Sequence, residues 1–253
     1  MTSFAGRHVL VTGAAVGIGR ATAEYLHQSG ALVFGVGLDG AAGRAAHEGK
    51  APGLIFHEVD LTDSAAVNAA IAQMMTLFPQ LDGVVNCAGI YPHGKRLEDL
   101  TDGEWQRTLD VNLGTVFKVC RATLPLLRAA GGGSVVNIAS VHADATVPGV
   151  PAYAASKAGI VGLSRQMALD YAVDRIRVNA ILVGSVATRM TLDSLEASGG
   201  AEALGLSFDT NRIARIAEPR EIASAIGFLL TDESSFITGS AMQVDGGMLA
   251  RLL

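Results

Sequence analysis

The chain has 253 residues, of which 49% are hydrophobic and 17% are charged, and its formal net charge is −5. This length and composition provide a large core and suit one sizeable α/β domain or two small ones. The acidic balance argues against nucleic-acid binding, which requires clustered Lys and Arg, and no run approaches the roughly 18 apolar residues of a membrane span.

The cysteines and histidines give no sign of a disulfide framework or a metal site. Cys87 and Cys120 lie within apolar segments, and neither their spacing nor that of the histidines is typical of zinc ligands. The N-terminal residues run directly into a strand-like segment without the layout of a secretory signal. We therefore expect a cytoplasmic protein that binds no metal, nucleic acid or membrane.

Apolar, β-branched runs alternate with helical segments along the chain, which predicts a parallel sheet covered on both faces. The predicted strands span 8–12, 32–36, 54–59, 81–86, 133–140, 176–182 and 240–244. The predicted helices span 17–29, 64–78, 104–130, 152–172 and 219–231. No linker or repeat interrupts this alternation.

A glycine-rich turn, "TGAAVGIG", follows the first strand and opens the first helix with Gly13, Gly17 and Gly19. Such a turn lets backbone N–H groups approach a pyrophosphate at a helix N-terminus. The G-x-x-x-G-x-G spacing differs from the commoner dinucleotide fingerprint. A tight turn without a ligand is the alternative, but the position after the first strand favours nucleotide binding.

The segment "TDGE" at 101–104 has the form of a capping box at the start of the long 104–130 helix. Asn112 lies inside that helix, although asparagine is a weak helix former. We expect a local backbone distortion or a buried water contact there, and a satisfied buried amide is the plainer alternative.

The segment "PAYAASKAGIVG" at 151–162 places Tyr153 and Lys157 four positions apart, on one helix face. A free phenol has a pKa near 10, so lowering it toward neutrality requires about 4 kcal/mol. A unit charge about 4 Å away at an effective dielectric of about 20 supplies that amount, so Lys157 is sufficient to make the phenol a base. Ser140, at the end of a predicted strand, is placed to donate a hydrogen bond to a substrate oxygen. The alternatives are a core tyrosine, a solvated lysine and an ordinary turn serine.

The irregular segment 184–215 lies between a strand and a helix, and segments of this kind are typical of lids or binding loops. Its apolar residues would either form the lid or pack the segment down. They are Met190, Leu192, Leu195, Leu204, Leu206 and Phe208.

Taken together, these motifs resemble the short-chain dehydrogenase/reductase family over nearly the whole length. The matching segments are "TGAAVGIG" (12–19), "VDLTD" (59–63), "NCAG" (86–89), Tyr-x-x-x-Lys and the region 215–247. Cys87 and Val183 depart from the family pattern. The resemblance implies one domain over 1–253, with a doubly wound Rossmann fold of seven parallel strands and NAD(P)-linked oxidoreduction.

The resemblance also implies site residues. Asn112, Ser140, Tyr153 and Lys157 match the catalytic set, in which the asparagine anchors water in a proton relay. The predicted cofactor contacts are Gly13, Gly17, Ile18, Gly19, Asp39, Asp60, Leu61, Asn86, Ala88, Gly89, Tyr153, Lys157, Gly184, Val186 and Thr188. The candidate substrate contacts are His93, His142 and Val150.

The end of the second predicted strand favours NAD without excluding NADP. Gly37 occupies the family's usual carboxylate position, and Asp39 follows two residues later. A carboxylate there binds the ribose 2′-hydroxyl and repels a 2′-phosphate. Arg44 is the nearest basic residue.

The predicted function is interconversion of a small-molecule secondary alcohol and its ketone. A nucleotide-binding regulatory protein and a dehydratase or epimerase of the same fold are the alternatives, although all four catalytic positions are filled. We expect a homotetramer, because small residues mark the 152–172 helix and the 104–130 helix and the tail "MLARLL" are apolar.

Overall fold

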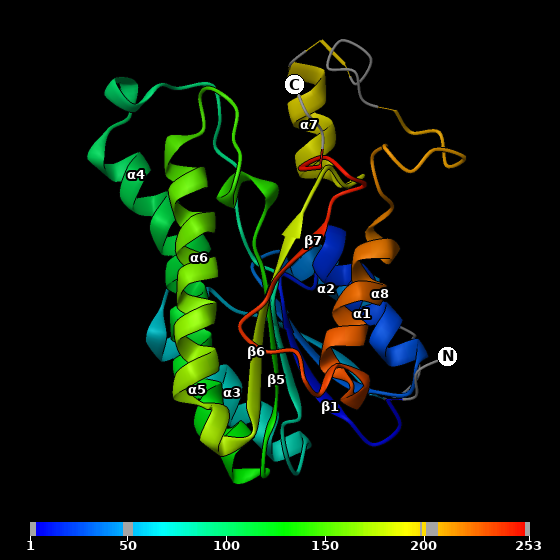
Figure 1. Cartoon of the computed structure of the whole chain (residues 1–253). Helices are drawn as coiled ribbons and strands as arrows, with labels where there is room; N and C mark the ends of the chain where they lie inside the picture. Colours follow the sequence, from blue (N-terminus) through cyan, green and yellow to red (C-terminus); the bar gives the residue numbers. More distant parts are fainter. Residues whose placement is uncertain (1–3, 48–52, 198, 201–206, 251–253) are drawn as a thin grey trace.

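One sheet of seven parallel strands organises the chain (Figure 1). The computed structural model describes residues 4–47, 53–197, 199–200 and 207–250. The strands are β1 His8–Thr12, β2 Leu32–Gly37, β3 Leu54–Glu58, β4 Gly83–Asn86, β5 Gly133–Ile138, β6 Ile176–Val183 and β7 Ala241–Val244. Their order, β3-β2-β1-β4-β5-β6-β7, reverses between β1 and β4. The predicted doubly wound single-domain fold is confirmed.

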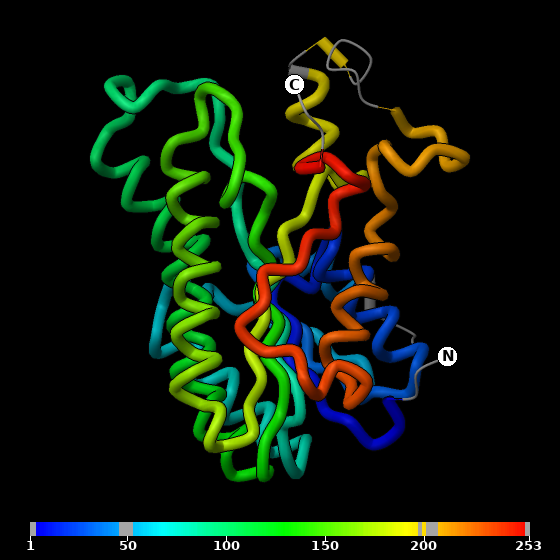
Figure 2. Tube along the Cα trace, viewed as in Figure 1, coloured from blue at the N-terminus to red at the C-terminus, as the bar shows by residue number. Residues whose placement is uncertain are grey.

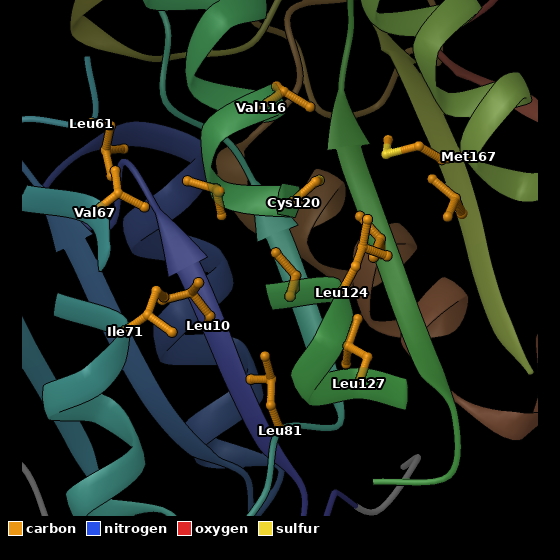
Figure 3. Packing of buried hydrophobic residues seen from close by; sticks show 14 of the residues in the cluster. Leu10, Leu61, Val67, Ile71, Leu81, Val116, Cys120, Leu124, Leu127 and Met167 are labelled. Carbon is orange, nitrogen blue, oxygen red and sulfur yellow. The ribbon is translucent and has the colours of Figure 1, made fainter. Parts of the chain in front are cut away.

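Helices cover both faces of the sheet. On one face lie α1 Gly17–Gln28 and α8 Pro219–Leu230, which pack against each other, and on the other lie α3 Ser64–Leu77, α5 Thr115–Ala129 and α6 Pro151–Asp170. Because side chains alternate along a strand, β1 contributes to both cores: Val9 faces the α1–α8 side and Leu10 the other. Figure 3 shows Leu10 beside Ile71 of α3 in the second core. Burial on both faces explains why the strands are continuous apolar runs.

The predicted 104–130 helix is divided by a π-helical turn. It comprises α4 Asp102–Leu109, a π-helical turn Asp110–Gly114 and then α5. The capping box at Thr101 and Glu104 is confirmed, with backbone-to-side-chain distances of 2.9 and 3.2 Å. Asn112 lies within the π-helical turn, so the distortion expected from this residue is present. Single π turns inside helices often occur at functional sites.

Two helices were not predicted from the sequence. Helix α2, Gly40–His47, follows β2, and the Asp39 carboxylate accepts a hydrogen bond from the backbone N–H of Ala42 (3.0 Å). Helix α7, Arg189–Ala197, lies within the 184–215 segment. Both are short, with 8 and 9 residues, so each offers only about two turns in which a helical pattern could be recognised.

The 184–215 segment follows β6 and leads toward helix α8, as the yellow-to-orange trace in Figure 2 shows. Val186 pairs with Ala217 in an isolated parallel bridge. Ala217 also donates to Ser185 O (2.9 Å) and accepts from the N–H of Ala187 (2.8 Å). These contacts join the beginning of the segment to the residue that follows its end, near the carboxyl ends of the strands. Leu204 and Leu206 lie outside the described residues.

In the described part of the chain, no helix has the length and apolar character needed to cross a membrane. The same residues bring together no group of three His, Cys, Asp or Glu side chains that would hold a metal ion.

Candidate active site

The glycine positions of the turn after β1 leave little room for a side chain. Gly13 and Gly17 adopt φ values of +66° and +56°, a left-handed conformation that favours glycine. A Cβ atom on Gly19 would lie 2.2 Å from the Gly13 carbonyl oxygen. No side chain caps the N-terminus of α1 at Val16. The turn therefore presents the start of α1 to an anionic group, as a dinucleotide site requires.

A cavity of about 220 Å³ lies over this turn, at the carboxyl ends of the central strands. It brings together twelve of the residues predicted from the sequence, from five separate segments of the chain. These are Gly13, Gly17, Ile18, Gly19, Ala88, Gly89, Ser140, Tyr153, Lys157, Gly184, Val186 and Thr188.

Other cavity residues were not assigned to the site from the sequence. They are Val16, Cys87, Ile90, Ile138, Ala139, Val183, Arg189, Met190 and Thr191. Most are apolar residues within two positions of a predicted site residue, and this closeness in the sequence was the only indication that they line the cavity. Arg189, Met190 and Thr191 begin helix α7, which was not predicted, although Met190 was named among the apolar residues of the predicted lid.

The Asn112 side chain joins three parts of the site. Its Oδ1 accepts from the backbone N–H of Ile90 (2.8 Å), and its Nδ2 donates to Ile90 O (3.1 Å) and to Ser156 Oγ (3.0 Å). Ser156 in turn donates to the carbonyl of Tyr153 (2.7 Å). Asn112 is fully buried and does not line the cavity. It holds the loop after β4 against helix α6, which carries Tyr153 and Lys157.

Gly89 permits this close packing. A Cβ atom at this position would lie 3.1 Å from Asn112 Oδ1 and 3.6 Å from Lys157 Nζ. The first distance is tighter than an ordinary van der Waals contact, so a side chain at this position would press on the Asn112 amide.

Ser140, Tyr153 and Lys157 converge on one wall of the cavity. Ser140 lies just beyond β5, two residues after the strand ends, and its hydroxyl hydrogen-bonds Tyr153. The Lys157 ammonium donates to the Ile138 carbonyl (2.9 Å) and lies 5.6 Å from the centre of the Tyr153 ring. Only 5% of Lys157 is exposed, so its charge is held in a largely dry site.

The expectation that Lys157 lowers the pKa of Tyr153 is wrong for the protein without ligands. Burial raises the pKa of Tyr153 to about 12, although the hydrogen bond from Ser140 acts in the opposite direction. Burial also lowers the pKa of Lys157 to about 8. Desolvation is the largest influence on both pKa values, because burial disfavours the charged form of each group.

The remaining predicted cofactor residues lie outside the cavity lining. Asp39 caps α2, and Asp60 accepts from both the N–H (2.8 Å) and the hydroxyl (2.7 Å) of Thr62, which lowers its pKa. Leu61 is buried in the core. The Asn86 side chain lies on the sheet face covered by α5, where its Nδ2 donates to Asn137 Oδ1 (2.8 Å) and to Cys120 Sγ (3.3 Å). Its Oδ1 is buried and has no hydrogen-bond partner among the described residues.

The candidate substrate residues have different environments. His142 packs against Tyr153, with ring centroids 5.5 Å apart. His93 is exposed and contacts Tyr91, at 5.3 Å, rather than Tyr153. Val150 is buried before the start of α6 and lines a separate surface depression. Tyr91 packs edge-on against Tyr153 at 4.7 Å, which makes it a stronger candidate than His93 or Val150.

Comparison with known proteins gives matches over nearly the whole chain. Residues 13–249 match the family model described as enoyl-(acyl carrier protein) reductase. The 2-keto-3-deoxy-L-fuconate dehydrogenase of Xanthomonas campestris pv. campestris is 35% identical over 251 residues, covering 97% of this chain and 81% of that protein. The trans-4-hydroxycyclohexanecarboxylate dehydrogenase of Sinomonas cyclohexanicum is 38% identical over 251 residues, covering 95% and 92%. The crystal structure of levodione reductase has a TM-score of 0.89 at 32% identity, covering 98% of this chain and 100% of that one.

The doubly wound sheet, the glycine turn and the Ser140–Tyr153–Lys157 wall define a nicotinamide-dependent oxidoreductase. The chain belongs to the short-chain dehydrogenase/reductase family, as the sequence motifs indicated. It is an NAD(P)-dependent enzyme that interconverts secondary alcohols and ketones.

The raised pKa of Tyr153 gives a direct spectroscopic prediction. The ligand-free protein and Tyr153→Phe should show the same phenolate absorbance from about pH 7 to pH 10, because Tyr153 ionises only near pH 12. A pH titration in the near ultraviolet measures this. One additional tyrosine ionising below about pH 9 in the parent protein would contradict the assigned environment.

Proposed function

We propose that the enzyme oxidises a ring-bearing secondary alcohol with NAD, and that Tyr153 transfers the alcohol proton. The convergence of Ser140, Tyr153 and Lys157 on the cavity beside the glycine turn carries this proposal. The same turn, where Gly19 has no room for a Cβ atom, fits the pyrophosphate of a dinucleotide. When bound, the oxidised cofactor supplies a hydride acceptor and a positive charge.

Each residue of the wall has a distinct role in this proposal. Tyr153 accepts the hydroxyl proton during oxidation and returns it during reduction, for which its protonated resting form is already suited. Ser140 donates a hydrogen bond to the substrate oxygen, where negative charge develops. Lys157 provides positive charge to the phenolate and binds the nicotinamide ribose. Asn112 positions helix α6 through Ser156.

A ring-bearing substrate fits the apolar part of the cavity wall. Ile90, Ile138, Val186 and Met190 provide apolar contacts. The names of two of the relatives, trans-4-hydroxycyclohexanecarboxylate dehydrogenase and levodione reductase, support the same class. We assign 184–215 as the segment that covers the substrate, because its first helix contributes residues to the cavity.

A hydroxy-acid substrate is the second candidate, in line with the fuconate dehydrogenase relative. Arg189 lines the cavity and would pair with a carboxylate. Its side chain is 91% exposed and lies 3.7 Å from Asp193, so this contact would be weak without closure of the segment.

Replacing the proposed proton-transfer residue tests the mechanism. Tyr153→Phe should reduce kcat by at least about 10²-fold, because general acid–base catalysis contributes about 10²–10⁴. Cofactor affinity, measured by calorimetry, should change little because the ring remains. Tyr25→Phe, in a tyrosine packed between α1 and α8, should retain activity. Activity of Tyr153→Phe within a few-fold of the parent would rule out the role.

We propose NAD as the preferred cofactor. Gly37 lies against the glycine turn, since a Cβ atom there would be 3.6 Å from Gly13 Cα, and Asp39 follows it. One Asp39 carboxylate oxygen caps α2, which leaves the other for a ribose hydroxyl. Arg44 lies 3.5 Å from the Glu58 carboxylate, so it already has an anionic partner instead of a 2′-phosphate.

The charge of Asp39 should account for about a tenfold preference for NAD, corresponding to about 1.4 kcal/mol. Asp39→Asn should reduce the ratio of kcat/KM for NAD to that for NADP by about this factor. Asparagine retains helix-capping ability, so the variant isolates the charge from the stability of α2. A higher kcat/KM with NADP than with NAD in the parent enzyme would contradict the choice of NAD. An unchanged kcat/KM ratio in Asp39→Asn would show that the Asp39 charge does not cause the preference.

We also propose a homotetramer that uses the outer faces of α5 and α6. Phe117 and Leu169 on these helices are 49% and 76% exposed. Gly162 has open space beside it, whereas Gly159 packs closely on Leu113. Residues 251–253 of the predicted apolar tail lie outside the described part of the chain.

Light scattering of the purified enzyme at micromolar concentration should report a tetramer. Leu169→Glu should shift it to smaller species, because burying an unpaired carboxylate in an interface is unfavourable. A monomeric parent enzyme would contradict the proposal.

A further inference from the structure

Three aromatic rings pack around one another beside the cavity, and one of them belongs to the proposed proton-transfer residue. Tyr91 and His142 both contact Tyr153 nearly edge-on, with interplanar angles of 86° and 80°. Tyr91 and His142 also contact each other, at 5.8 Å between ring centroids. Tyr91 follows β4 and His142 follows β5, so both lie at the strand ends where ligands bind in open α/β sheets.

Two polar atoms of this cluster have no protein partner. His142 Nδ1 pairs with Thr146 Oγ1 at 3.0 Å. Among the described residues, neither His142 Nε2 nor the Tyr91 hydroxyl forms a hydrogen bond with the protein. Both side chains are only partly exposed. Neither residue lines the cavity beside the glycine turn, but both rings contact Tyr153, so the two atoms are available to a ligand that extends past Tyr153.

The protonation states of both groups suit a neutral ligand. Burial lowers the pKa of His142 and raises the pKa of Tyr91, so both are uncharged near neutral pH. A neutral imidazole offers a lone pair or an N–H at Nε2, according to its tautomer, and the phenol can both donate and accept. A hydroxyl or carbonyl oxygen on the ligand can form a hydrogen bond with at least one of these two groups, whereas a hydrocarbon ring without an oxygen can form none.

We propose that Tyr91 and His142 bind a second oxygen on the substrate, so that the enzyme prefers a ring carrying two oxygen functions, such as a diol or a hydroxy ketone. This inference rests on the proposed oxidation of ring-bearing alcohols. Tyr153 takes the proton of the reacting hydroxyl, and the two neighbouring side chains hydrogen-bond the other oxygen. Tyr91 and His142 are then specificity-determining residues that also fix which ring carbon faces Tyr153.

The test compares kcat/KM for cyclohexanol with that for 1,2-, 1,3- and 1,4-cyclohexanediol, with NAD at saturation. In the parent enzyme at least one diol should be preferred about tenfold, as expected for one additional hydrogen bond. Tyr91→Phe and His142→Phe keep an aromatic ring but remove the polar atom, so each should reduce this preference several-fold. Tyr25→Phe is the matched control, because it removes a phenol hydroxyl from a ring that packs between α1 and α8 and does not line the cavity, and it should keep the parent ratio.

The outcomes separate this inference from the proposed function. A parent enzyme that oxidises cyclohexanol as efficiently as every diol would contradict the second oxygen contact alone. A diol preference that persists in both Tyr91→Phe and His142→Phe would also overturn it. Turnover of none of the four compounds, with cofactor binding intact, would contradict the ring-alcohol proposal and this inference together.

Discussion

The hydrogen bonds of the buried Asn112 amide are the constraint on which the site depends. They hold the backbone of Ile90 on one side and Ser156 of α6 on the other. Asn112 lies in a π-helical turn, so the helix departs from regular α-helical geometry at this residue. Gly89 has no side chain, so Asn112 and Lys157 can both approach it, and the loop after β4 packs closely against the helix that carries Tyr153. The positions of the reacting groups therefore depend on a side chain that does not line the cavity.

Burial sets the protonation of Tyr153 and Lys157, the two side chains proposed to take part in the reaction, in the ligand-free protein. The pKa of Tyr153 is raised to about 12 and that of Lys157 is lowered to about 8, because each group loses the water that would stabilise its charge. The free protein thus holds a protonated phenol, ready to donate a proton to a ketone oxygen. Removing that proton from Tyr153 for oxidation requires additional positive charge in the site, which couples the phenol to the redox state of the cofactor.

The residues that line the site follow several different strands of the sheet. The turn after β1 provides a surface that suits an anion, the ends of β4 and β5 provide Gly89 and Ser140, and the segment after β6 provides the first residues of α7. Parallel strands bring all of these ends to one edge of the sheet, so distant parts of the sequence meet without long connections. Connecting segments tolerate sequence changes better than the elements that they connect. The segment between the paired residues Val186 and Ala217 is such a connection, so it can vary while the sheet is retained.

The sequence by itself determined the fold and most of the cavity lining, because these depend on local signals. Apolar runs identify strands buried on both faces, and Gly13, Gly17 and Gly19 are required by a backbone conformation that can be anticipated from their place after a strand. The sequence also indicated a distortion at Asn112, since asparagine competes poorly inside a helix. It did not reveal helices α2 and α7, whose 8 and 9 residues are too few for a helical pattern to be recognised with the windows that such patterns need. Only the tertiary structure decided the hydrogen bonds of Asn112, the edge-on packing of Tyr91 and His142 on Tyr153, and the direction of the phenol pKa. Spacing along one helix places Lys157 near Tyr153, but desolvation depends on every element packed around them, and that is fixed only when the chain is folded.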